Sequence, residues 1–172
     1  MKSSTQNVAL YQLSYNQVKT YLLADLFIVG HIALPQLCHL MPQGGLIFLP
    51  IYFFTLVAAY KYGLVVVLTT AVLSPLVNSA LFVMPPAADL PIILIKSVTL
   101  AIAAALIAKK TNKVTLLTVA LAVIAYQLIG SLAELAITGS IEKASQDIIL
   151  GWPGCLIQIV GGFVILRYLL KK

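Results

Sequence analysis

The chain has 172 residues, of which 61% are hydrophobic and 9% charged, and its mean hydropathy is +1.03. A soluble domain carries about 25% charged residues, so this composition excludes a water-soluble fold and predicts an all-α, polytopic membrane protein. A net charge of +6 would suggest nucleic-acid binding in a soluble protein, but here it indicates basic cytoplasmic loops, and no nucleic-acid partner is expected.

Six apolar segments follow a polar lead-in. Residues 1–20 lack the apolar run and small-residue cleavage site of a signal peptide, so they are predicted to be a cytoplasmic lead-in to a membrane domain over 21–172. The second segment, which has Pro50 near its start, is short for a bilayer about 30 Å thick. The six predicted transmembrane helices cover about 21–40, 46–60, 64–83, 90–108, 114–138 and 148–170.

Lysine and arginine predict the orientation of these helices. With six spans, nearly all basic residues outside the spans fall on one side, and the positive-inside rule places that side and both termini in the cytoplasm. The opposite loops carry Asp89, Glu142, Lys143 and Asp147. A multi-pass protein of the bacterial cytoplasmic membrane is therefore expected. The basic residues of the cytoplasmic side are Lys2, Lys19, Lys61, Lys109, Lys110, Lys113, Arg167, Lys171 and Lys172.

Most polar residues of the predicted helices lie in the outer third of the bilayer. Asn78, Lys96, Glu134 and Trp152 lie there by their distance from the helix ends. A buried polar group costs several kcal/mol in hydrocarbon unless it is paired or wetted. Their gathering on one side predicts an outward-open cavity and not a through-pore, which would need polar groups at all depths. The first outer loop adds His39, Met41 and Gln43.

Each of these residues also has a purely structural interpretation. Lys96 and Glu134 could pair with each other and hold two helices together. Trp152 could be an interfacial belt residue. Asn78 could bond backbone groups that Pro75 leaves unpaired.

Cysteine and histidine raise the question of a metal. Cys38 and Cys155 form neither a disulfide framework nor a CxxC site. Cys38, His39 and His31 match no protein metal-site spacing, so no metal site is predicted, although any of the three could be an axial ligand to the metal of a corrinoid or haem. A packed Cys and a hydrogen-bonded His are the simpler interpretation. No catalytic motif is present, so neither an enzyme nor a resident cofactor is expected.

Several short motifs resemble one transporter family. The runs 44–50 (GGLIFLP), 62–63 (YG), 74–78 (SPLVN), 84–85 (MP) and 153–158 (PGCLIQ) look like those of the substrate-binding S components of energy-coupling factor (ECF) vitamin transporters. The resemblance covers about 21–172. It implies that the protein captures a vitamin or related micronutrient at its outer face, with a transmembrane coupling subunit and two ATPase subunits as partners. The ligand-binding residues it implies, by position, are His39, Met41, Gln43, Asn78, Met84, Lys96, Glu134 and Trp152.

One departure from the family bears on the ligand. The first helix offers Ala24, Gly30 and Ala33, but Ile28 interrupts the Ala-x-x-x-Ala pattern that docks the coupling subunit. The chain is in this respect similar to solitary cobalamin-type S components, for which Cys38 or His39 would be a cobalt ligand. The alternative function is a non-transport membrane scaffold of the rod-shape-determining type, which needs no outer cavity.

Overall fold

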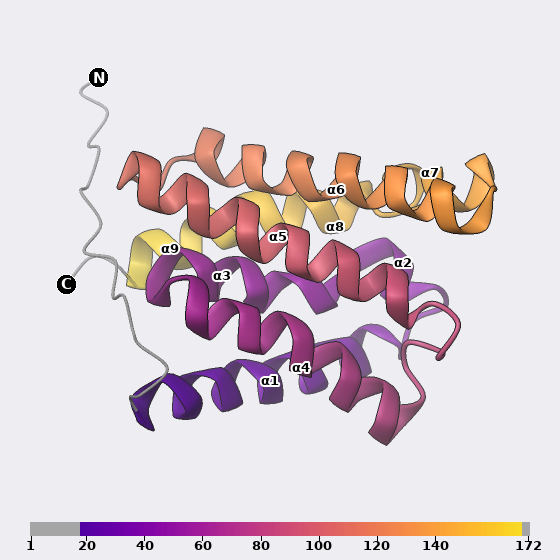
Figure 1. Ribbon diagram of the computed structural model, residues 1–172, viewed down its shortest axis with the longest axis horizontal. Coiled ribbons are helices and arrows are strands. Elements are labelled where there is room, and N and C mark those ends of the chain that lie inside the picture. The colour runs from indigo at the N-terminus through magenta and orange to yellow at the C-terminus, as the bar shows by residue number, and fades with distance from the viewer. Residues whose placement is uncertain (1–17, 170–172) are drawn as a thin grey trace.

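The structure, a computed structural model, describes residues 18–169, and these fold into helices without any β-strand. The helices run roughly along one axis and form a single bundle (Figure 1). In chain order they are α1 (Val18–Cys38), α2 (Gly44–Phe48), the 3₁₀-helix η1 (Pro50–Tyr52), α3 (Phe53–Tyr62), α4 (Leu64–Phe82), α5 (Leu90–Thr111), α6 (Leu116–Thr138), α7 (Ile141–Ile149), α8 (Trp152–Leu156), the π-helical η2 (Ile157–Gly161) and α9 (Gly162–Leu169).

Within the described residues, five helical segments are long and apolar enough to cross a membrane. They are α1, α4, α5, α6 and the continuous run α8–η2–α9. This confirms the all-α prediction and is compatible with a multi-pass membrane protein. Apolar side chains also cover the outside of the bundle, as a lipid-facing surface requires. Examples are Leu26, Leu106, Leu121, Leu128 and Val164, each more than 45% exposed.

The second predicted span is not one helix. Leu49 has a left-handed backbone (φ 45°, ψ 47°) and ends α2, and Pro50, which has no N–H to donate, begins η1. The ten residues of α3 rise only about 15 Å, half the thickness of a bilayer core. The segment 44–62 is thus a broken helix, and the apolar run at 46–60 was wrongly predicted to be continuous.

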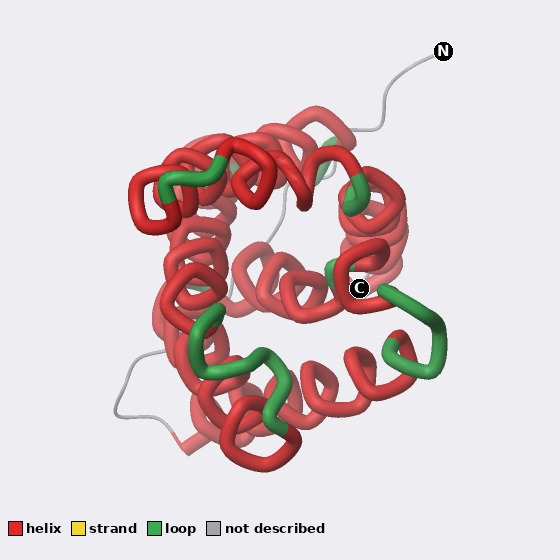
Figure 2. The backbone as a smooth tube through the Cα atoms, turned by 90° about the vertical axis from the view of Figure 1, so that its right-hand side faces the viewer, coloured by secondary structure: helices red, strands yellow, loops and turns green. Residues whose placement is uncertain are grey.

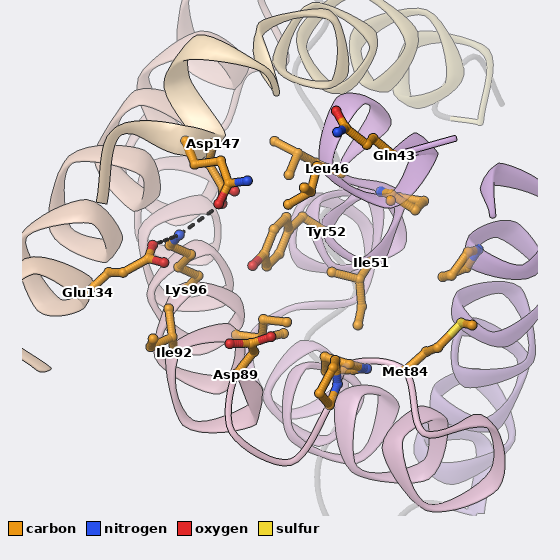
Figure 3. Close-up of a pocket in the computed structure, with 18 of the residues that line it drawn as sticks. Gln43, Leu46, Ile51, Tyr52, Met84, Asp89, Ile92, Lys96, Glu134 and Asp147 are labelled. Atoms are coloured by element: carbon orange, nitrogen blue, oxygen red, sulfur yellow. Dashed lines mark hydrogen bonds and ion pairs between the residues drawn. The ribbon is translucent and has the colours of Figure 1, made fainter. Parts of the chain in front are cut away.

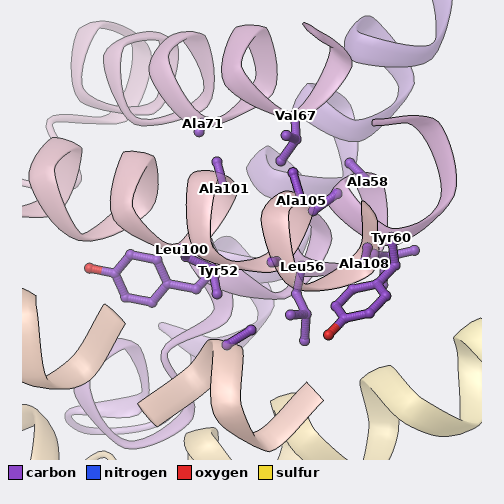
Figure 4. Packing of buried hydrophobic residues seen from close by; sticks show 14 of the residues in the cluster. Tyr52, Leu56, Ala58, Tyr60, Val67, Ala71, Leu100, Ala101, Ala105 and Ala108 are labelled. Carbon is purple, nitrogen blue, oxygen red and sulfur yellow. The ribbon is translucent and has the colours of Figure 1, made fainter. Parts of the chain in front are cut away.

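The centre of the bundle is α3, which packs against α1, α4, α5 and α9. Six consecutive residues, from Thr55 to Tyr60, are buried, so α3 has no outward face. The neighbouring helix α5 turns a stripe of small residues toward the core, which lets the helix backbones approach closely (Figure 4). The stripe consists of Ala101, Ala104, Ala105 and Ala108.

The break at Leu49 is held by a polar network from the last helix. Gln158, buried in η2, donates from Nε2 to the Leu49 carbonyl at 3.3 Å and accepts from the Tyr126 hydroxyl at 3.1 Å. Nearby, Gln127 Nε2 lies 3.0 Å from Cys155 Sγ. Gln127 and Gln158, in the last two long helical segments, therefore serve helix packing.

The two ends of the bundle differ in charge. The start of α1, the α3–α4 turn, the α5–α6 turn and the end of α9 lie together at the left in Figure 1. This end carries Lys61, Lys109, Lys110, Lys113 and Arg167. The α1–α2, α4–α5 and α6–α7 connections lie at the opposite end, which faces the viewer in Figure 2.

Candidate functional site

A cavity of about 540 Å³ opens at the end opposite the basic turns. Figure 3 shows its wall, to which the α1–α2 loop, α2, η1, the α4–α5 loop, α5, α6 and α7 all contribute. Pockets that enclose drug-sized ligands have volumes of roughly 300–1,000 Å³, so this one is large enough for a small organic molecule. Much of the wall is apolar, from Leu46, Ile51, Ile92 and Ile93.

An ion triad lies in the cavity wall. Lys96 on α5 donates from Nζ to Glu134 Oε2 on α6 at 2.5 Å and to Asp147 Oδ2 on α7 at 2.8 Å (Figure 3). Lys96 is only 2% exposed, and the two carboxylate side chains are 14% and 12% exposed. The predicted pairing of Lys96 with Glu134 is present, and three helices meet at these charges.

Gly130 makes room for the triad. It lies on α6 beside the Lys96 side chain, and a Cβ at this position would overlap Lys96 Cγ. The absence of a side chain at Gly130 lets Lys96 cross the α5–α6 contact and reach Glu134 one turn farther along α6. The sequence pattern of α6 alone does not reveal this role.

Asp147 was wrongly assigned to a loop. It lies on α7, a nine-residue helix whose N-cap is Ser140, with the Ser140 Oγ accepting from Lys143 N at 3.3 Å. Ala144 and Asp147 are three residues apart and form the buried side of α7. The signal for this helix was present in the Ser140 cap, in Glu142 in the first turn and in apolar residues at 141, 144 and 148.

The structure brings five of the predicted ligand residues together and leaves four outside. His39, Gln43, Met84, Lys96 and Glu134 line the cavity. Outside it lie Cys38, half-buried at the end of α1; Met41, exposed in the following loop; Asn78, buried between α1 and α4; and Trp152, 60% exposed on α8.

His31 lies in a separate polar cluster between α1, α3 and α4. Its Nε2 accepts from Thr55 N at 3.1 Å, and its Nδ1 lies 3.0 Å from Ser74 Oγ. Since Nε2 accepts a backbone hydrogen bond, the ring proton belongs on Nδ1, which donates to Ser74. Both ring nitrogens are thus occupied, and His31 does not line the cavity. Of the three suggested axial ligands, only His39 does.

Asn78 bonds a backbone carbonyl, but not the one expected. Its Nδ2 donates to the His31 carbonyl at 2.7 Å. Pro35, four residues after His31 in α1, has no N–H, so the His31 carbonyl lacks its helical partner. Asn78 therefore provides the hydrogen bond that Pro35 cannot donate to the His31 carbonyl on the neighbouring helix. The expectation that it serves Pro75 is wrong.

Tyr52, Asp89, Lys143, Gln146 and Asp147 line the cavity without having been predicted as ligand residues. Tyr52 is 2% exposed and its ring packs in a tilted arrangement against Tyr126, with 5.0 Å between the ring centroids. Within the described chain its hydroxyl has no hydrogen-bond partner. Figure 3 shows this hydroxyl pointing toward the Lys96 side of the cavity.

Across residues 18–169, no three His, Cys, Asp or Glu side chains are grouped so that they could hold a metal ion. Comparison with protein-family models, with curated proteins and with solved structures gives no match to this chain.

Proposed function

We propose that the protein is a membrane-embedded binding protein that captures a small organic micronutrient for uptake. The observation that carries this proposal is the cavity, which combines drug-sized volume, an apolar wall and buried charges at one end of an apolar helical bundle. Ionisable groups inside a membrane are costly, and they commonly mark a ligand or ion site. The proposed role is binding without catalysis.

The charge difference between the two ends supports an outward-facing cavity. The basic end belongs in the cytoplasm by the positive-inside rule, so the cavity opens to the outside. The broken segment α2–η1–α3 joins the cavity end to the basic end and is the proposed sixth crossing. Because α2 and η1 pack against α1, α4, α5, α7 and α8, the irregular backbone at Leu49 between them is shielded from lipid.

The proposed partners are those of an ECF S component, namely a transmembrane coupling subunit and ATPase subunits. A 540 Å³ cavity suits a vitamin of ordinary size better than a corrinoid, which is a macrocycle with a nucleotide tail. A cobalamin-like ligand would be recognised in the test below by its visible absorbance, and His39 is its proposed axial ligand.

The test is to purify the protein in detergent and record mass and absorbance spectra of any ligand that it releases. We expect close to one small molecule per chain, or a thermal shift with one member of a vitamin panel. Ile51→Trp should fill the cavity and abolish binding, because Ile51 lines the wall. Val164→Trp, on the exposed face of α9, is the matched control and should bind normally.

If the protein is instead a membrane scaffold, it should bind no ligand. An empty wild-type protein that shows no thermal shift with any vitamin would contradict the binding proposal and favour a scaffold, in which the Lys96 triad only joins helices.

A further inference from the structure

The charges that line the cavity do not balance. Asp89, Glu134 and Asp147 supply three negative charges, while Lys96 and Lys143 supply two positive ones. Asp89 and Lys143 are exposed near the opening, so solvent screens them. The enclosed group is the triad of Lys96, Glu134 and Asp147, whose formal charges sum to −1. An uncompensated charge in a low-dielectric environment is unfavourable, and a bound cation would neutralise it.

The triad also has unused acceptor atoms. Lys96 bonds Oε2 of Glu134 and Oδ2 of Asp147, and the other oxygen of each carboxylate has no partner within the described chain. Unlike Asn78 Oδ1, which is fully enclosed, these two carboxylate oxygens are accessible. Both carboxylates can therefore accept a further hydrogen bond from the cavity without losing Lys96.

Tyr52 provides a third polar atom at the same place. It is nearly fully buried, its hydroxyl has no partner in the described chain, and it points toward the side of the cavity where Lys96 lies (Figure 3). This hydroxyl is not fully enclosed, in contrast to that of Tyr60, so a ligand in the cavity can reach it, and buried tyrosines usually bond a partner through this group. A ligand group placed between Tyr52 and the two carboxylates would satisfy all of these atoms.

We infer that the ligand is a small organic cation that carries one net positive charge on an apolar or aromatic body. This inference rests on the proposed function. An anionic ligand would meet a Lys96 already neutralised by two carboxylates, and its own charge would be repelled by the excess negative charge of the triad. The apolar wall formed by Leu46, Ile51 and Ile92 would cover the rest of the molecule.

The test uses probes that differ in charge but little in shape. Titration calorimetry on the detergent-purified chain compares 1-methylnicotinamide, a cation, with neutral nicotinamide and anionic nicotinate. Thiamine, riboflavin and biotin repeat the comparison of cation, neutral molecule and anion at larger size. We expect the cation of each set to bind at least tenfold more tightly than the other two.

Charge-removing variants connect this preference to the triad. Glu134→Gln and Asp147→Asn each bring the sum of the triad to zero, so each should weaken binding of the cationic probe about tenfold or more, equivalent to about 1.4 kcal/mol. Glu142→Gln is the matched control, because Glu142 lies exposed on α7 outside the cavity wall, and it should bind as the wild type does. Size-exclusion profiles check that all variants stay folded.

The outcomes separate the two proposals. Tighter binding of a neutral or anionic probe, or a cation preference that survives both triad variants, overturns the inference and leaves the capture function standing. If no probe binds and no ligand copurifies, both proposals fail.

Discussion

At the scale of single residues, the structure pairs polar groups that the sequence leaves far apart. The ammonium group of Lys96 is nearly fully buried, yet it contacts two carboxylates on two other helices. Burying a charge is costly, and pairing with an opposite charge offsets that cost; here one cation serves two anions. Removal of the single cation should therefore be more harmful than removal of either anion.

We predict that Lys96→Met lowers stability strongly, because it leaves Glu134 and Asp147 facing each other without a cation. Breaking a buried ion pair in this way costs about 3–5 kcal/mol. Glu134→Gln, which keeps a hydrogen-bond acceptor for Lys96, should cost much less. Thermal unfolding in detergent measures both. Equal effects of the two variants would contradict the assignment of Lys96 as the centre of the triad.

Asn78 offers a second prediction at this scale. Its amide is the partner of the His31 carbonyl that Pro35 leaves unpaired. Asn78→Ala should destabilise the protein by about 1–3 kcal/mol, the cost of an unsatisfied buried polar group. In a Pro35→Ala background, residue 35 regains an N–H for the same carbonyl, so the Asn78→Ala effect should shrink. A double-mutant cycle of unfolding measurements checks this coupling, and strict additivity would argue against it.

At the scale of helices, close approach depends on small residues at a few crossings. The alanine stripe of α5 packs against the core, and Gly130 of α6 gives the Lys96 side chain its path between α5 and α6. Such contacts leave no free volume for an added atom, because protein interiors are packed to the density of organic crystals.

Gly130→Ala should consequently disturb the α5–α6 contact. Its Cβ would overlap Lys96 Cγ, and overpacking of this kind typically costs 1–3 kcal/mol. Gly161→Ala in η2 is the control, since its nearest neighbour would be Phe53 Cε2 at 3.5 Å, an ordinary contact. Thermal unfolding of the two variants should show a loss for Gly130→Ala only. A similar loss for both would mean that helix flexibility, and not the Lys96 contact, is responsible.

At the scale of the whole molecule, the distribution of charge relates the fold to the membrane. The turns between α3 and α4 and between α5 and α6 carry basic residues, and the opposite end carries the cavity. Translocating lysines across a membrane is unfavourable, so we expect the basic end to stay in the cytoplasm. The proposed direction of ligand capture depends on this orientation.

Cysteine labelling of intact cells checks the orientation. In a chain with Cys38 and Cys155 replaced by alanine, Asn112→Cys in the basic α5–α6 turn should resist a membrane-impermeant maleimide until the cells are lysed. Glu142→Cys at the cavity end should be labelled at once. Labelling of Asn112→Cys from outside would reverse the orientation and remove the support for an outward-facing cavity.

The sequence by itself determined the helical class, the approximate bounds of five long helices and the end of the bundle at which polar groups gather. These properties follow from composition and position along the chain, since each long apolar segment must satisfy its backbone within itself. Their similar predicted depth also made the pairing of Lys96 with Glu134 one of two interpretations, and the structure contains this pair.

Only the tertiary structure determined the hydrogen-bond and ion-pair partners of the polar side chains. The broken helix at Leu49, the ion pair of Asp147 with Lys96 and the bond from Asn78 to the His31 carbonyl all depend on contacts between segments distant in sequence. The same is true of the exclusion of Cys38 and Trp152 from the cavity. Hydropathy gives the depth of a residue but not the direction in which its side chain points, and that direction is set by how the helices rotate and pack against one another.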